Sequence, residues 1–300
     1  MLMPDATMPG IFGSRAKLFQ SMKAKTRNVI SIALLVAAMI LLSAVWRRCT
    51  ESSVSEAGRI ESKILNKTMR FSVYLPPGYY VESFRGRKYP VLYIFHGASG
   101  NHTTYPRQAG IRKIVDDAIR SGRVQPMVVV MPAAVGGIYC SLNRGVYPFE
   151  EFFWGELVPH IEKTYRVFGE KRFRAVAGHS MGGGGALIYG LKYPDKFASC
   201  CALGAAIQIN ESSDNGSPVG ENDIVTLLHR VAELRKADDD NIVRYYIDCG
   251  KSDTLRTVNE KLHEIMDERN IEHEYHEGDG GHTWEYWRNG MPGVLEFISK

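Results

Sequence analysis

Two hydrophobic patterns alternate along most of this chain, namely short apolar runs and longer segments with helical spacing. Continuous or alternating apolar runs are typical of strands in a sheet. We expect strands at residues 70–79 (where the pattern stops at Pro76-Pro77-Gly78), 89–97, 126–132, 172–178, 197–204, 243–250 and 272–278. Helical spacing predicts helices at residues 108–122, 149–167, 181–193, 222–236, 255–269 and 284–298. Apolar strands that alternate with helices predict an α/β fold, a parallel sheet covered by helices on both faces.

The N-terminal region has a different pattern. Residues 1–28 carry several basic side chains and a single acid, Asp5, and residues 29–46 form an uncharged apolar run. A run of about 18 residues can cross a bilayer as a helix, whereas the core of a signal peptide is shorter and precedes a small-residue cleavage site. Because this run ends in Trp46 and two arginines, we expect an uncleaved signal anchor, with a cleaved signal peptide as the alternative.

Charge and composition then divide the chain. More basic residues precede the apolar run than follow it. By the positive-inside rule we therefore expect the N-terminus to stay in the cytoplasm and the rest of the chain to be exported. We expect a basic cytoplasmic segment (1–28), a transmembrane signal anchor (29–46), a polar linker (47–57) and one catalytic domain (58–300). Within that domain, the polar stretch 205–241 is a candidate lid insertion. The formal net charge is only +4, much of it N-terminal, so we expect no nucleic-acid partner.

The cysteines are scattered and odd in number. They have neither the spacing of a disulfide framework nor zinc-ligand spacing with histidines. We expect buried free thiols, and one disulfide among the last four remains the alternative for an exported protein. The sequence also has no phosphate-binding loop, so we expect no metal and no cofactor. The five cysteines are Cys49, Cys140, Cys200, Cys201 and Cys249.

The stretch Gly178-His179-Ser180-Met181-Gly182 has the form G-x-S-x-G. It follows a predicted strand and precedes a predicted helix, which is the context of a nucleophile elbow. In such a turn the serine hydroxyl projects above the sheet at the positive end of the helix. Ser180 is therefore the candidate nucleophile, and the alternative is a glycine-rich packing turn with an incidental serine.

A serine nucleophile needs a base and an acid that orients it. His282 lies in a glycine-rich loop after the last predicted strand, where the base of such a fold belongs, and the other late histidines lie within predicted elements. For the acid we favour Asp253, in the loop beyond strand 243–250, over Asp248 at the strand end. Asp279 is more typical of a turn aspartate.

Two backbone N–H groups should hold the oxyanion of the reaction. One belongs to Met181, directly after the nucleophile, and the other to Ala98, in the loop that follows the strand 89–97. Loss of one such donor typically slows catalysis by about 100–1,000-fold. Trp284 and Tyr105 are candidate substrate contacts, for which core packing is the alternative.

Several stretches together resemble the putative-esterase family of α/β-hydrolases, which includes feruloyl and acetyl xylan esterases, S-formylglutathione hydrolases and mycolyltransferases. The resemblance runs over residues 58–298, and the feruloyl-esterase-like branch is the most similar. It implies an α/β-hydrolase fold, a triad of Ser180, Asp253 and His282, and oxyanion donors at Met181 and Ala98. The stretches are "VYLPPGY" (73–79), "YPVLYIFHG" (89–97), "ELVPHIEKTYRV" (156–167), "AGHSMGGGGAL" (177–187), "YPDKFA" (193–198), "DCGKSD" (248–253) and "GGHTWEYWR" (280–288).

The leading hypothesis is a serine carboxylic ester hydrolase that works through an acyl-enzyme on feruloyl or acetyl esters of polysaccharides. An acyltransferase with a sugar or lipid acceptor would use the same intermediate, and a catalytically silent surface-binding module is the alternative from another class. The expected partners are a small-molecule or carbohydrate ester and the membrane. The catalytic domain should lie outside the cytoplasm, either anchored or secreted after signal cleavage.

Overall fold

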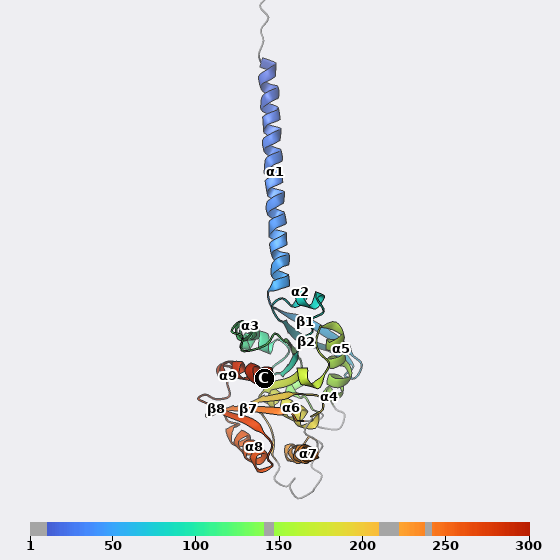
Figure 1. Cartoon of the computed structure of the whole chain (residues 1–300), viewed down its shortest axis with the longest axis vertical. Helices are drawn as coiled ribbons and strands as arrows, with labels where there is room; N and C mark the ends of the chain where they lie inside the picture. The colour runs from blue at the N-terminus through green and yellow to red at the C-terminus, as the bar shows by residue number, and fades with distance from the viewer. Residues whose placement is uncertain (1–10, 141–146, 210–221, 238–241) are drawn as a thin grey trace, which may run out of the picture. The chain divides into compact units, whose positions relative to one another are not determined.

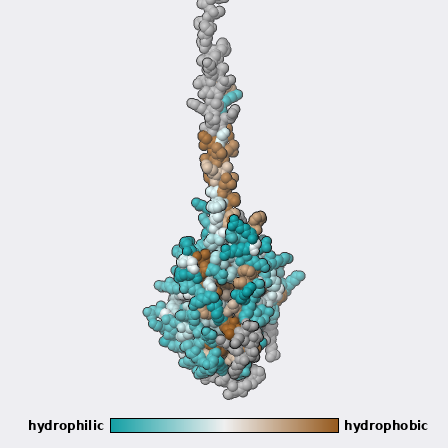
Figure 2. Space-filling model, viewed as in Figure 1, coloured by the Kyte–Doolittle hydropathy of each residue, from teal (hydrophilic) through white to brown (hydrophobic). Residues whose placement is uncertain are grey.

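The computed structural model describes residues 11–140, 147–209, 222–237 and 242–300 (Figure 1). The chain divides into two units, Met1–Thr50 and Glu51–Lys300. The first unit contains the helix α1 (Ile11–Thr50), whose apolar side chains give the brown band in Figure 2. Within the described residues, its stretch Ile30–Arg47 is the one helical stretch long and apolar enough to cross a membrane.

An eight-stranded sheet organises the second unit, in the order β1-β2-β4-β3-β5-β6-β7-β8. β2 pairs antiparallel with both β1 and β4, and all the other neighbours are parallel. The mostly parallel sheet predicted from the apolar runs is therefore confirmed. The strands are β1 (Ser53–Ser62), β2 (Lys67–Leu75), β3 (Val91–Phe95), β4 (Val128–Pro132), β5 (Arg174–His179), β6 (Ser199–Leu203), β7 (Arg244–Gly250) and β8 (His273–Gly278).

Helices cover both faces of this sheet (Figure 1). The helices α3 (Ile111–Arg120) and α9 (Trp284–Ser299) share one hydrophobic core with the sheet. The other core contains α4 (Phe149–Phe152), α5 (Val158–Thr164), α6 (Met181–Lys192), α7 (Ile224–Ala237) and α8 (Arg256–Glu268). Because side chains alternate along a strand, the consecutive residues Cys200 and Cys201 on β6 belong to opposite cores. The predicted covering of both faces is confirmed.

Short elements complete the described chain. The helix α2 (Tyr79–Phe84) follows β2, which ends at Leu75, directly before the expected stop at Pro76. The remaining turns are η1 (Tyr105–Ala109), η2 (Val135–Gly137), η3 (Phe153–Leu157) and η4 (Lys171–Phe173).

Two stretches differ from the sequence-based expectation. The interval 47–57, predicted to be a linker, is occupied by the end of α1 and the beginning of β1, which pairs with β2 from Ser53 onward. The helix predicted at 149–167 is interrupted by a π-helical turn, η3, between α4 and α5. Pro159 lies in the first turn of α5 and has no N–H to donate, which is a local reason for an irregular turn just before it.

The predicted lid lies partly outside the described residues, since 210–221 and 238–241 are not among them. Within the described part, α7 packs Leu228 and Val231 into a hydrophobic core. The cysteines all lie in described segments, and no disulfide joins them there.

Candidate active site

Ser180 occupies the sharp turn between β5 and α6. Its backbone has φ 55° and ψ −124°, a conformation that side chains rarely adopt. The turn is held by three hydrogen bonds: Ser180 N–H donates to Leu203 O at 2.9 Å, and its carbonyl accepts from Gly184 N–H at 3.0 Å and Ala206 N–H at 2.9 Å. Such strain persists only where the surroundings enforce it, and it is concentrated at functional sites.

The glycines that flank Ser180 permit a close approach of α6 to the sheet. A Cβ atom on Gly178 would lie 2.2 Å from the carbonyl oxygen of Gly182, and one on Gly182 would lie 2.2 Å from that of Phe95. Both separations are far below van der Waals contact, and the obstructing atoms belong to the backbone. Only glycine therefore fits at these two positions of the elbow.

A continuous chain of hydrogen bonds links Ser180, His282 and Asp253. His282 Nε2 lies 2.8 Å from Ser180 Oγ, and His282 Nδ1 lies 2.8 Å from Asp253 Oδ2 and 3.0 Å from Oδ1. The Asp253 side chain is fully buried, and Oδ1 also accepts the Leu255 N–H at 2.8 Å. With its Nδ1–H donating to the carboxylate, His282 turns the lone pair of Nε2 toward the serine hydroxyl, as a general base requires.

The sheet brings these three side chains together. Ser180 follows β5, Asp253 follows β7 and His282 follows β8, so all three lie beyond the carboxyl ends of the parallel strands β5-β6-β7-β8. Gly204, directly after β6, has φ 48°, and a Cβ there would lie 2.9 Å from Asp253 Oδ2 and 3.4 Å from His282 Nδ1. Glycine at this position leaves room for the Asp253–His282 pair.

The two other acids considered from the sequence lie elsewhere. Asp248 is buried and accepts a hydrogen bond from the Tyr286 hydroxyl, and burial raises the pKa of its carboxyl group. Asp279 is exposed and forms a 2.9 Å ion pair with Lys251. Asp253 is thus the candidate acid that the structure places against the imidazole.

The expected oxyanion donors lie close to one another. A Cβ on Gly137 would lie 3.0 Å from Met181 Cβ and 3.1 Å from Ala98 N, and one on Gly97 would lie 3.2 Å from Ser180 Cβ. Among the described residues, neither the Met181 N–H nor the Ala98 N–H donates to another backbone carbonyl. Two backbone donors beside the serine can stabilise a negatively charged oxygen there. The proximity of Gly137 was not predicted from the sequence.

His179 holds the loop that carries Ala98. Its Nε2 accepts the Gly97 N–H at 3.2 Å, and its Nδ1 lies 2.9 Å from the Tyr105 hydroxyl, which donates to Phe95 O at 3.3 Å. Burial lowers the pKa of His179 to about 3, so the ring is neutral near pH 7. The neutral tautomer with the proton on Nδ1 can form all of these hydrogen bonds: Nδ1–H donates to the Tyr105 oxygen, and Nε2 accepts the Gly97 N–H. The sequence analysis missed this role, because nothing in the motif tells which way its histidine points.

The two aromatic candidates for substrate contact differ in position. Tyr105 is 1% exposed and its hydroxyl bonds to His179, which argues against direct contact with a substrate. Trp284 is half-buried at the start of α9, where its ring packs edge-on against those of His179, at 4.5 Å, and Trp287, at 5.3 Å. Trp284 therefore remains a candidate for substrate contact.

This chain is similar to known proteins over most of its length. A family model described as "Putative esterase" matches residues 62–298. An acetyl esterase of Caldicellulosiruptor saccharolyticus is 25% identical over 264 residues, covering 80% of this chain and 96% of that protein. A solved ferulic acid esterase is 33% identical with a TM-score of 0.73, covering 83% of this chain and 98% of that one. An S-formylglutathione hydrolase from Staphylococcus aureus, 23% identical with a TM-score of 0.69, shares the fold over 84% of this chain and all of its own.

Proposed function

Because this chain belongs to the Putative esterase family and is a carboxylic ester hydrolase, we propose that Ser180 is its nucleophile, His282 its general base and Asp253 the acid that orients the base. The observation that carries this proposal is the unbroken hydrogen-bond chain from Ser180 Oγ through both ring nitrogens of His282 to the buried carboxylate of Asp253. No cofactor is needed for this chemistry.

In the first half-reaction, Ser180 Oγ attacks the ester carbonyl carbon while its proton passes to His282 Nε2. The carbonyl oxygen becomes an oxyanion, which the N–H groups of Met181 and Ala98 stabilise. Asp253 stabilises the imidazolium that forms. The imidazolium then returns the proton to the alkoxy oxygen, the C–O bond breaks, and the alcohol leaves behind an acyl-Ser180 ester.

Water completes the second half-reaction at the same site. His282 removes a proton from the water as its oxygen attacks the acyl carbon, and the oxyanion again rests on the two backbone amides. Collapse of this intermediate transfers the proton to Ser180 Oγ and releases the carboxylic acid. An alcohol in place of water would make the reaction an acyl transfer, so analysis of products with and without a sugar acceptor distinguishes the two outcomes.

The proposed substrates are feruloyl or acetyl esters of polysaccharides. Support comes from the relatives, which are named a ferulic acid esterase and an acetyl esterase and match nearly their whole lengths. Trp284 is half-buried with its ring 4.5 Å from that of His179, the residue before the nucleophile, and offers an aromatic surface for an acyl group. Comparison of rates on methyl ferulate and on an acetylated xylan decides which acyl group the site prefers.

The nucleophile is tested with the full chain in detergent and a short aryl ester, 4-nitrophenyl acetate. Ser180→Ala should abolish turnover, because within the described part of the chain Ser180 Oγ is the group that hydrogen-bonds to His282 Nε2. The matched control is Ser121→Ala, at the end of α3, where the hydroxyl donates to Ala118 O and accepts from Arg123 Nε. Full activity of Ser180→Ala would show that the proposed nucleophile is wrong.

We also propose that residues 29–46 anchor the enzyme in a membrane with the catalytic unit outside the cytoplasm. The support is a continuous helix, α1, whose apolar side chains are exposed along Ile30–Arg47, with basic residues before them in the sequence. An anchored chain should stay in the membrane pellet after carbonate extraction and be degraded by protease added outside intact cells. A soluble product that begins after residue 46 would instead indicate a cleaved signal peptide.

A further inference from the structure

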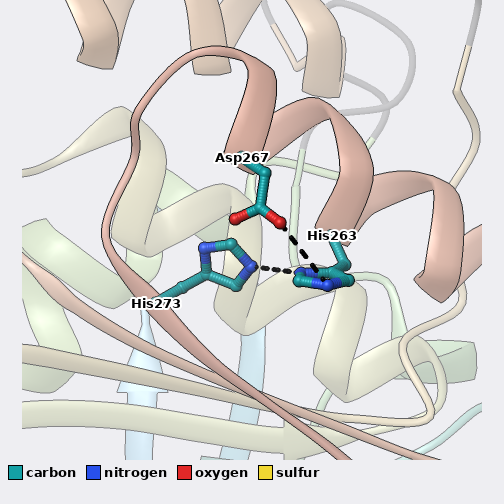
Figure 3. Close-up of side chains that lie close together, drawn as sticks. All are labelled: His263, Asp267 and His273. Atoms are coloured by element: carbon teal, nitrogen blue, oxygen red, sulfur yellow. Dashed lines mark hydrogen bonds and ion pairs between the residues drawn. The ribbon is translucent and has the colours of Figure 1, made fainter.

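A second cluster of chemically capable side chains lies on α8 and β8. His263 and Asp267 project from α8, and His273 is the first residue of β8 (Figure 3). One ligand atom from each residue lies within 4.8 Å of the other two. Figure 3 shows the Asp267 carboxylate turned toward the two imidazole rings. None of these three residues takes part in the ester chemistry proposed above.

The local fold explains why the three side chains converge. His263 and Asp267 are four residues apart on a helix and therefore share one face. After α8 the chain turns at Asn270, which has φ 55°, and Ile271 N–H donates back to Met266 O at 2.8 Å. This left-handed helix ending reverses the chain direction, so β8 begins beside the last turns of α8.

Hydrogen bonding and stacking fix the two rings. His273 Nδ1 donates to Ile271 O at 2.7 Å, which leaves a lone pair on Nε2, only 2.7 Å from His263 Nδ1. His263 stacks on Tyr275 at 4.4 Å with an interplanar angle of 1°. A histidine whose second nitrogen donates to a backbone carbonyl has the orientation found in metal-ligating histidines. Two ring nitrogens this close must share either a proton or a cation.

We propose that His263, Asp267 and His273 bind one divalent transition-metal cation of the zinc class. Two imidazoles and one carboxylate suit zinc, nickel or cobalt, whereas magnesium and calcium prefer oxygen ligands. With metal–nitrogen bonds of about 2.0–2.1 Å at a tetrahedral centre, the two nitrogens would lie about 3.3 Å apart. The rings must therefore separate by about 0.6 Å, and the side chains of His263 and Asp267, 35% and 65% exposed, have room to adjust.

The cation would act as a clamp between α8 and β8, outside the ester site. His273 begins β8, whereas His282 follows its other end, and six strand residues span about 20 Å. α8 begins shortly after Asp253 and β8 ends shortly before His282. The clamp thus joins the helix that follows the acid to the strand that precedes the base, and its measurable effect is added stability of the folded chain.

The test is titration of ZnCl2 into the untagged, metal-stripped full chain in detergent, followed by calorimetry and thermal melting. We expect one zinc per chain with a Kd below about 10 μM and a higher Tm with zinc. His263→Gln and His273→Gln should each weaken binding by at least about tenfold and remove the zinc-dependent rise in Tm. The matched control is His276→Gln, an exposed histidine of the same strand that faces Glu274 instead, which should bind zinc as the wild type does.

Asp267→Asn tests whether weaker binding in the histidine variants comes from misfolding. The Asp267 side chain is mostly exposed, so its replacement leaves the core unchanged. This variant should also bind zinc more weakly. The proposal is overturned if the wild type does not bind one equivalent, or if the cluster variants bind with the wild-type Kd. Hydrolysis of 4-nitrophenyl acetate by the metal-stripped chain reports separately on the ester site, and it should remain.

Discussion

The substitution His179→Phe removes the buried imidazole that holds the oxyanion loop. In the native structure, His179 Nε2 accepts the Gly97 N–H at 3.2 Å, and Nδ1 donates to the Tyr105 hydroxyl at 2.9 Å. Phenylalanine fills a similar volume but offers neither nitrogen. Gly97 N–H then loses its acceptor, one residue before the proposed donor Ala98.

The size of the effect follows from these contacts. A buried N–H without an acceptor costs about 1–3 kcal/mol, and the loop can relieve this cost only by moving toward water. Such a movement displaces the Ala98 N–H. Complete loss of an oxyanion donor slows catalysis by about 100–1,000-fold, and a weakening of about 1.4 kcal/mol slows it tenfold. We therefore expect kcat to fall between about tenfold and 1,000-fold, with little change in KM because the oxyanion exists only beyond the ground state.

The assay is steady-state hydrolysis of 4-nitrophenyl acetate by the full chain in detergent, with circular dichroism to verify folding. His102→Phe is the matched control, since His102 is also buried, but it lies in the loop after β3 and the charged groups that act on it are Arg70, Glu56 and Arg107 rather than the triad. It should retain the wild-type kcat. A folded His179→Phe enzyme with an unchanged kcat would refute the claim that His179 holds the loop that carries Ala98.

Three further predictions concern the acid, the elbow and pH. Asp253→Asn should lower kcat by up to about 10⁴-fold by favouring the wrong imidazole tautomer. Asp248→Asn alters contacts to Tyr286 and Tyr246 but none to His282, and should lower kcat far less in the same assay. Gly178→Ala should lower the Tm strongly, because the added Cβ would lie 2.2 Å from a backbone oxygen. A Cβ on Gly169 meets nothing within 3.4 Å, so the control variant Gly169→Ala should melt near the wild-type Tm. Burial lowers the pKa of His179 to about 3, from 6.5. Below pH 6.5 the unfolded chain therefore binds more protons than the folded chain, so the contribution of His179 to the free energy of unfolding is complete above about pH 6.5 and declines toward pH 3. Urea unfolding across this range should show a smaller decline for His179→Gln, and an identical decline would contradict the assignment.

The sequence predicted the buried part of the fold better than its edge. Strands such as β3 and β4 are buried at every position, and this burial is why they appear as continuous apolar runs. β1 has a single buried residue, Ser62, so its sequence carries no apolar signal, and the sequence analysis assigned its first residues to a linker. The π-helical turn η3 was missed because the apolar spacing of residues 149–167 is that of a regular helix.

The sequence predicts a site residue when its position in the chain and its local pattern are enough to identify it. Ser180, Asp253 and His282 each follow a strand, which the apolar pattern reveals. By contrast, His179 contacts Tyr105 and Gly97, 74 and 82 residues away in the sequence, and no local pattern records such pairs. Tyr105 was considered for the substrate because it is aromatic, but the burial of its ring depends on packing that only the fold determines.

The central claim, that Ser180 is an activated nucleophile, is tested most directly by fluorophosphonate labelling of the full chain in detergent, followed by peptide mapping. The account predicts one covalent adduct, on the peptide that contains Ser180, and no adduct in the Ser180→Ala variant. A folded wild-type chain that stays unlabelled, or that is labelled on a different residue, would contradict it.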